Sequence, residues 1–254
     1  ETNIALLNRV LDILGDDDAE TLLAREASLH DVLTRMTANL PQLQGIFIMD
    51  ETGHLVATNR AYPAPHAIDF TDRAFFQHHR DSGAQPYITD VLTSRTTGEL
   101  FFDVSLRRNR EGGRFGGAVS SSLTPLYFGD FYREVTSGDE AFGIALVRAD
   151  GAVLASWPRQ PVASDSGKSS IGIGLRNAQA VAENGLPDVG NGLVATRALE
   201  GYPIKVVAWT LQSAVRASWL EDLALLAAVM LPLTLSLMYV AWIALRTTRR
   251  SLAS

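Results

Sequence analysis

One stretch near the end of the chain constrains its fold more than any other. Residues 223–245 run for about twenty-three positions without a charged side chain. An α-helix rises about 1.5 Å per residue, so this stretch is long enough to cross a bilayer core about 30 Å thick. Pro232 and Ser236 interrupt it, but membrane helices tolerate such residues. The sequence therefore predicts a transmembrane helix at 223–245.

The residues that flank this stretch differ in charge. Two acids precede it and three arginines follow it: Glu221 and Asp222, then Arg246, Arg249 and Arg250. Basic residues collect on the cytoplasmic side of membrane spans, so residues 1–222 should lie outside the cytoplasm and 246–254 inside it. An exterior domain needs a route across the membrane. We therefore expect a longer protein, with another span before Glu1 and a cytoplasmic part after Ser254.

Composition excludes several classes of protein. The formal net charge is −6, and the sequence has no basic patch of the kind that marks nucleic-acid binding, so we expect no nucleic-acid partner. Cysteine is absent, which excludes disulfides, thiolate metal sites and a cysteine nucleophile.

The first forty residues have a helical pattern. Apolar residues recur at spacings of three, four and seven between about residues 3 and 40, and Pro41 ends the pattern. Residues 15–18, Gly-Asp-Asp-Asp, interrupt it and are expected to kink or divide the helix. These acids lack the spacing of a calcium loop, so we interpret them as a solvated helix start.

Two stretches about a hundred residues apart share one layout. Residues 45–59 and 143–157 each place an apolar strand before an Asp/Gly turn and a second apolar strand after it, which is typical of a β-hairpin. The repetition predicts two tandem modules. Further strands are expected near 86–93, 99–108, 115–122, 192–199 and 203–210, and further helices at about 70–81, 124–135 and 212–222. The predicted fold class is α+β, with antiparallel sheets.

The stretch between the hairpins carries motifs that together resemble a known family. They are Asp72-Arg73-Ala74-Phe75-Phe76 with His79, Tyr87-Ile88, Ser94 to Gly98, Leu106-Arg107-Arg108, Gly113 to Val119, and Tyr127-Phe128 with Phe131-Tyr132. This set resembles the membrane-distal module of the double Cache (PAS-like) sensor domains found outside the membrane in bacterial receptors. The second copy resembles the membrane-proximal module through Leu146 to Gly151, Gly201-Tyr202-Pro203 and Trp219.

The resemblance covers about residues 1–222 and implies a division of the chain. Residues 1–41 would form a long N-terminal helix in a homodimer, 42–137 the distal Cache module, 138–211 the proximal module and 212–222 a juxtamembrane helix. The transmembrane helix and the start of a cytoplasmic segment follow at 223–245 and 246–254. The implied location is a bacterial inner membrane, with 1–222 in the periplasm.

Similar sensors hold small ligands in the distal module through an arginine and aromatic side chains. The matching positions make candidates of Arg73, Phe76, His79 and Tyr87, with Asp103, Ser105 and Ser120 as partners on the facing strands. A guanidinium group is a planar fork of donors that suits a carboxylate or phosphate. The alternative is that Arg73 pairs with Asp72 or Asp90 and the other residues only pack.

One departure from the family bears on the ligand. Members that sense amino acids carry Tyr where this chain has Phe76, and an acid in the strand that here reads AVSSSL, residues 118–123. Without that acid there is no evident clamp for an α-ammonium group. We therefore expect a carboxylate or another anion as the ligand.

The sequence lacks the residue patterns of a metal site, a serine nucleophile and a phosphate-binding loop. His78 and His79 are adjacent and diverge by about 100° on a helix, so they cannot face one metal. There is no G-x-S-x-G nucleophile motif, and residues 167–169 lack the earlier glycine of a phosphate loop. We expect no catalytic residue, metal or cofactor in this chain.

The resemblance thus implies a small-ligand sensor that passes a conformational change in a dimer across the membrane. The output most similar in sequence is that of two-component sensor histidine kinases. A diguanylate cyclase or chemoreceptor output stays open. So does an ectodomain that only dimerises, and an extracytoplasmic hydrolase is the remaining alternative.

Overall fold

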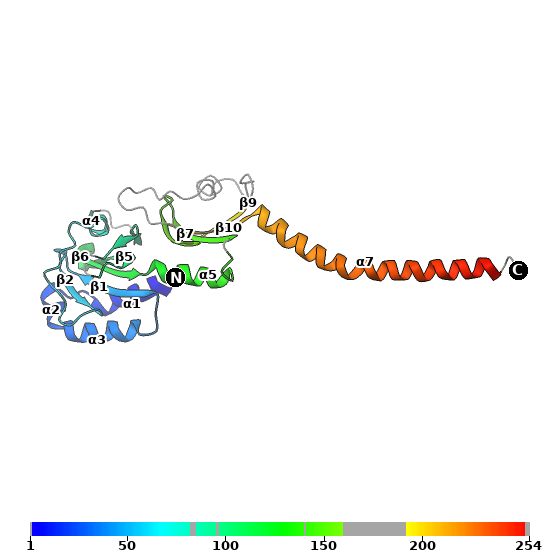
Figure 1. Ribbon diagram of the computed structural model, residues 1–254. Helices are drawn as coiled ribbons and strands as arrows, with labels where there is room; N and C mark the ends of the chain where they lie inside the picture. Colours follow the sequence, from blue (N-terminus) through cyan, green and yellow to red (C-terminus); the bar gives the residue numbers. More distant parts are fainter. Residues whose placement is uncertain (1, 82–84, 95–96, 140, 160–191, 252–254) are drawn as a thin grey trace.

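A computed structural model describes residues 2–81, 85–94, 97–139, 141–159 and 192–251 of the chain (Figure 1). It contains two antiparallel sheets with helices packed beside them, which confirms the predicted α+β class and the pair of sheets. Residues 167–169, which were considered for a phosphate loop, lie outside the described residues.

The first sheet has the strand order β2-β1-β6-β5-β3, with β4 also paired to β5. Its strands are β1 (Leu43–Met49), β2 (Leu55–Thr58), β3 (Tyr87–Ile88), β4 (Leu92–Thr93), β5 (Leu100–Arg110) and β6 (Arg114–Leu123). The strand predicted at 86–93 is therefore two short strands, β3 and β4. The long β5–β6 hairpin forms the centre of the sheet and pairs with β1 on one side and β3 on the other.

Helices cover both faces of this sheet. Alternate residues such as Ile46, Ile48 and Val119 pack in one core with leucines of α1 (Thr2–Leu14) and α3 (Glu26–Thr37). The other alternation carries Met49 and Ala118, which pack against α4 (Ala74–Asp81). Figure 1 shows α1 and α3 on one side of the sheet and α4 on the other. Period-two alternation thus separates an apolar core from a second, more polar face.

The N-terminal helix is divided, as the Gly15–Asp18 interruption suggested. Its pieces are α1, α2 (Ala19–Ala24) and α3, and Asp18 caps α2 by accepting a hydrogen bond from the Thr21 amide at 2.8 Å. Arg108 of β5 is almost fully buried and donates to the carbonyls of Gly15 and Asp17, and to that of Gly116 at 3.1 Å. The interruption is therefore a turn fastened to the sheet.

The second sheet has the order β8-β7-β10-β9. It is built from β7 (Phe142–Arg148), β8 (Val153–Trp157), β9 (Gly192–Ala198) and β10 (Ile204–Leu211). The two predicted hairpins are present as β1–β2 and β7–β8, and both turns contain a glycine with positive φ, 91° at Gly53 and 93° at Gly151. Glycine adopts this conformation without the steric cost that a Cβ brings.

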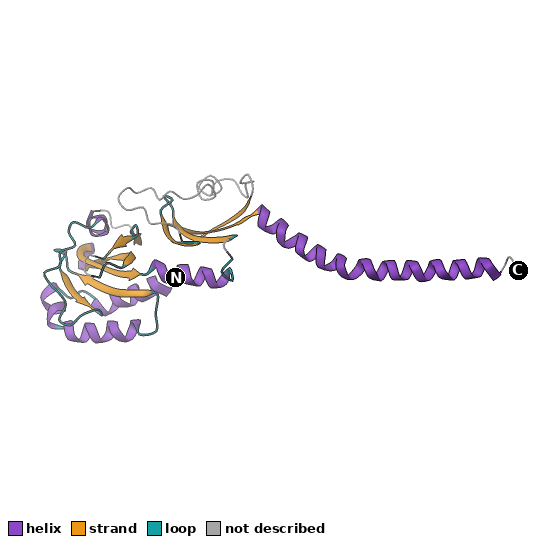
Figure 2. Cartoon of the chain, viewed as in Figure 1, coloured by secondary structure: helices purple, strands orange, loops and turns teal. Residues whose placement is uncertain are grey.

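Two helices adjoin the second sheet, one before its first strand and one after its last strand. Helix α5 (Pro125–Val135) follows β6 directly and packs against β8, so it links the sheets. Helix α7 (Gln212–Ser251) is a single element that joins the predicted 212–222 and 223–245 segments and extends away from both sheets (Figure 2). Within the described part of the chain, no helix is both long enough and apolar enough to cross a membrane. The predicted membrane span is therefore not confirmed.

Candidate functional site

The face of the first sheet beneath α4 is lined by buried polar side chains. In the β5–β6 ladder, Asp103 lies opposite Ser122, and Ser105 lies opposite Ser120. Tyr87 of β3 lies opposite Ser105 on the other side. Because these residues alternate with core positions such as Val104, their side chains share the face that α4 covers. The structure thus brings four predicted site residues together on three adjacent strands.

Helix α4 supplies the apolar part of this site. Phe75 and Phe76 are 2% and 1% exposed and pack against Met49 and Ala118 of the sheet. The ring of Phe76 meets that of Phe115 edge-on at 5.4 Å between centroids. The C-terminal end of the helix is held by Arg107 of β5, whose guanidinium donates to the carbonyl of His79 and lies over the Phe115 ring. The helix is therefore fixed over the polar face.

His79 connects α4 to the polar strands. It is fully buried, and its Nε2 lies 2.9 Å from Oγ of Ser105, which is also fully buried. Its ring lies 6.3 Å from that of Tyr87, while the neighbouring His78 ring is 4.7 Å from Tyr87. Consecutive histidines thus contact Tyr87 from one helix. Among the residues that the structure describes, no group of three or more His, Asp or Glu side chains is placed to hold a metal.

Asp103 is the charged group at the bottom of this face. Asp103 as a whole is 6% exposed, and its carboxylate accepts a hydrogen bond from Oγ of Ser122 at 2.5 Å. Burial raises the pKa of Asp103 to about 6, against the opposing effects of the Ser122 hydrogen bond and the positive charge of Arg73. Thr89 fixes its backbone, because Oγ1 of Thr89 accepts from the Asp103 amide at 2.8 Å and the Thr89 amide donates to the Asp103 carbonyl.

Arg73 lies immediately before α4, and its carbonyl accepts a hydrogen bond from the Gln77 amide of the first turn. Its side chain is 25% exposed, with Asp72 as its ion-pair partner at 4.0 Å. Asp90, the other acid considered as its partner, instead accepts from Arg148 of β7 at 2.7 Å. Arg73 therefore stands at the rim of the polar face, close enough for its charge to act on Asp103.

Two polar residues of this face, Thr89 and Ser122, were not among the predicted site residues. The signal for both is present in the sequence, because Thr89 follows Tyr87 by two positions and Ser122 follows Ser120 by two. Residues that alternate along a strand share a face.

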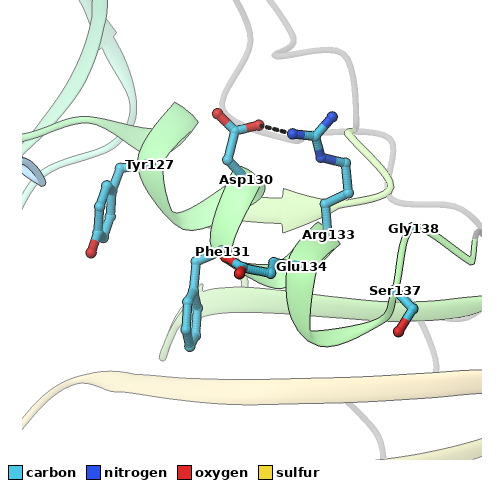
Figure 3. A pocket seen from close by; sticks show the side chains of 7 residues that line it. All are labelled: Tyr127, Asp130, Phe131, Arg133, Glu134, Ser137 and Gly138. Carbon is cyan, nitrogen blue, oxygen red and sulfur yellow. Dashed lines mark ion pairs between the residues drawn. The ribbon is translucent and has the colours of Figure 1, made fainter.

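The described residues also form an open hollow of about 570 Å³ away from this face (Figure 3). It lies along α5, where Tyr127 and Phe131 project to the same side of the helix and Asp130 pairs with Arg133 at 3.7 Å. The remaining lining residues are Glu134, Ser137 and Gly138. None of its lining residues was predicted as a site residue.

The sequence matches no family model and no curated protein. The structure, in contrast, resembles many solved domains. One is the extracellular domain of rpHK1S-Z16, a protein assigned to the histidine kinases, with a TM-score of 0.62 and 24% sequence identity over 86% of this chain and 92% of that domain. The chain has the double Cache fold.

Two further neighbours with this fold are chemoreceptor ligand-binding domains. That of PctB from Pseudomonas aeruginosa PAO1, solved with L-Arg, has a TM-score of 0.58 at 16% identity over 87% of this chain and 84% of that one. That of CtaA from Pseudomonas fluorescens, solved with L-valine, has a TM-score of 0.55 at 16% identity over 82% and 86%. The double Cache fold predicted from the motifs around Arg73 is thus confirmed, and the three neighbours named here are an extracellular domain of a histidine kinase and two ligand-binding domains of chemoreceptors.

Proposed function

We propose that this chain is the extracytoplasmic sensor region of a membrane-bound signalling receptor, and that it binds a small ligand under α4 in its distal module. The observation that carries the proposal is the buried polar face formed by Asp103, Ser105 and Ser120, with His79 above it. Small-molecule sites combine apolar walls with a few placed polar groups that orient the ligand, so several buried polar side chains beside a charged rim favour a polar ligand. Solved double Cache neighbours that hold L-Arg and L-valine support this class of ligand.

The candidate residues have distinct roles in this proposal. Arg73 stands at the rim and binds the negatively charged group of the ligand through its guanidinium fork. Phe76 and Tyr87 form apolar walls, and His79, Ser105 and Ser120 offer hydrogen bonds. This set contains no catalytic role, because the proposed event is reversible binding.

Transmission to the membrane is the second part of the proposal. The modules at 42–137 and 138–211 touch through α5 and Arg148, and β10 of the second sheet continues directly into α7. A homodimer formed along 1–41 would have two packings, and a ligand shifts their balance by its difference in affinity for the two. The span at 223–245 and its orientation rest on the absence of charged residues there and on the arginines that follow.

The type of cytoplasmic output domain is inferred from sequence resemblance alone. We place the chain in a two-component sensor histidine kinase, with a diguanylate cyclase or a chemoreceptor as alternatives. The neighbours support both a kinase and a chemoreceptor context. An ectodomain that dimerises without a ligand is the alternative that the binding experiment below separates from a sensor.

A thermal-shift screen of the 254-residue chain in detergent tests the proposal. Organic acids, amino acids, amines and nucleobases are added singly, and a ligand at about 100 times its dissociation constant should stabilise the fold by about 2.7 kcal/mol. Arg73→Ala should abolish the shift. Arg80→Ala is the matched control, because Arg80 lies on α4 but pairs with the exposed Asp81. A blank screen, or a shift that survives Arg73→Ala, would contradict ligand binding at this face.

A further inference from the structure

Helix α5 presents apolar side chains to the surface that neither the fold nor the proposed ligand site uses. Within the described residues that precede α7, most of the large apolar side chains that are exposed lie on α5 or at the start of β7: Leu126, Tyr127, Phe131, Val135 and Phe142. Single exposed apolar residues need no explanation, but several of them on one helix are typical of an interaction surface.

Three of these residues form one row along the helix. Tyr127, Phe131 and Val135 follow one another at a spacing of four, so they lie on a single ridge, which we call the α5 stripe. Figure 3 shows Tyr127 and Phe131 projecting to the same side of α5. The buried residues of α5 are Gly129 and Tyr132, on the other side of the helix. The α5 stripe is therefore left over after the helix has packed against its own sheet.

The rings of the α5 stripe are held in place from below. Tyr127 meets Phe128 edge-on at 5.7 Å between centroids, and Phe131 lies 5.9 Å from Tyr132, which is 7% exposed. Phe128 lies in turn 5.9 Å from Phe102 of β5. Side chains that packing already orders lose less conformational freedom on association, and aromatic anchors of this kind supply much of the binding energy at protein interfaces.

The helices at 1–41, where we expected the homodimer contact, expose much less apolar surface. Leu23, at 44%, is the large apolar side chain that α1, α2 and α3 expose. Other apolar residues of α1 are partly buried and pack against the core of their own chain: Ile4, Leu6, Leu11 and Ile13. Because permanent dimer interfaces are more apolar than the remaining surface, the α5 stripe suits such a contact better than 1–41 does.

We propose that a second copy of this chain binds at the α5 stripe, with the two α5 helices antiparallel about a two-fold axis near Phe131. The α5 stripe is symmetric about Phe131, because Tyr127 and Val135 lie four residues to either side of it. An antiparallel copy therefore places Tyr127 against Val135 of the partner subunit and Phe131 against its own counterpart. A contact between identical surfaces requires this self-complementarity. The inference rests on the homodimer of the proposed function and gives that dimer a different contact surface.

The charges beside the α5 stripe are compatible with a second copy. Asp130 is neutralised within its own chain by Arg159 at 2.8 Å and by Arg133 at 3.7 Å. Like charges that meet across an interface oppose association. Since the acid is already paired in each copy, two copies can meet here without bringing unpaired Asp130 carboxylates together.

Disulfide cross-linking of the 254-residue chain in detergent tests this geometry. The sequence has no cysteine, so an introduced cysteine is the only thiol. In the antiparallel pair, residue 127 lies about 12 Å along the helix from its own counterpart but beside residue 135 of the other copy. A disulfide requires Cα atoms within about 7 Å. We therefore expect a mixture of Tyr127→Cys and Val135→Cys chains to form a mixed disulfide on oxidation, and either variant alone to form little.

Ala5→Cys and Ala27→Cys are the matched controls, because both residues are exposed on the helices of 1–41. They should not cross-link. If they do and the mixture of Tyr127→Cys and Val135→Cys chains does not, the inference is wrong, while a dimer along 1–41 stands. If no pair cross-links, both contact surfaces are wrong, and the ligand screen alone then tests the remaining part of the proposed function.

Sedimentation of uncross-linked chains gives a second measurement. Phe131→Glu should weaken dimerisation by at least about 100-fold, because the change occurs twice at the two-fold axis and sets two carboxylates side by side. Leu23→Glu is its control, since it places the same charge on the exposed apolar residue of 1–41. It should dimerise as the wild type does. A monomeric wild type, or dimers that survive Phe131→Glu but not Leu23→Glu, would overturn the inference.

Discussion

Arg148 of β7 donates a hydrogen bond to the carboxylate of Asp90, between β3 and β4, at 2.7 Å. The same guanidinium donates to the carbonyl of Ile88 at 2.9 Å and pairs with Asp150 of its own hairpin turn. Asp150 raises the pKa of Arg148 further above its ordinary value. Ile88 lies between Tyr87 and Thr89 of the proposed site. One arginine of the second sheet therefore contacts the strand segment that borders the polar face of the first sheet.

Removing Arg148 should destabilise the contact between the sheets more than removing Asp90. Arg148→Ala loses the bond to the Ile88 carbonyl as well as the ion pair, so we expect a loss of about 1–2 kcal/mol, against about 0.5 kcal/mol for the largely exposed Asp90→Ala. Urea denaturation of both variants and the double variant gives the coupling energy. Equal losses for the two single variants would show that the Ile88 bond contributes nothing.

The stability of the ligand-free chain should depend on Asp103 with a definite sign. The folded pKa is about 6 and the ordinary value is 3.8, so the folded state binds the proton more tightly than the unfolded state. The stabilisation is fully present below pH 3.8 and is lost as pH rises through 6, an amount of about 3 kcal/mol. Asp103→Asn should therefore be more stable than the wild type at pH 8. Urea denaturation at pH 5 and pH 8 measures this difference, and a destabilised Asn variant at pH 8 would contradict it.

Two phenylalanines on different helices should differ in their contribution to stability. Phe76 of α4 is 1% exposed, and Phe131 of α5 is 52% exposed. Phe76→Ala opens a cavity and should cost about 3–5 kcal/mol, whereas Phe131→Ala should cost about 1 kcal/mol or less. Chemical denaturation compares them directly. Similar losses would mean that α4 does not pack on the sheet as described.

Arg108 should be essential to the turn between α1 and α2. Arg108→Met leaves the carbonyls of Gly15, Asp17 and Gly116 without their buried donor, and we expect a loss of about 3–5 kcal/mol. Arg114→Met is the matched control on the same hairpin, because Arg114 is exposed. The free energies of unfolding of the two variants should differ by at least about 2 kcal/mol. A near-equal pair would show that the turn is not fastened through Arg108.

The order of strands and helices could be predicted from local pattern. Apolar alternation and the Asp/Gly turns located both hairpins, and Gly15 to Asp18 marked the division of the first helix. Three residues of the candidate site, Arg73, Phe76 and His79, were proposed from the motif at and just before α4, and their role in binding stays a prediction.

Burial and pairing between distant residues could not be predicted in this way. Asp103 becomes a buried charge only because α4 covers its strand, and Asp90 is paired with Arg148, fifty-eight residues away, and not with the nearer Arg73. Both facts depend on how the elements pack, which local pattern does not encode. Ser122 and Thr89 differ, because period-two alternation from Ser120 and Tyr87 was sufficient to find them.

Hydrogen exchange with and without the best probe from the screen tests the central claim most directly. Backbone amides that the ligand orders exchange more slowly, so the position of the protection locates the site. We predict added protection in α4, in β3 and in the centres of β5 and β6, near Asp103 and Ser120, with little change in β8. Protection confined to the second sheet, or to α5 around Phe131, would contradict a ligand site beneath α4.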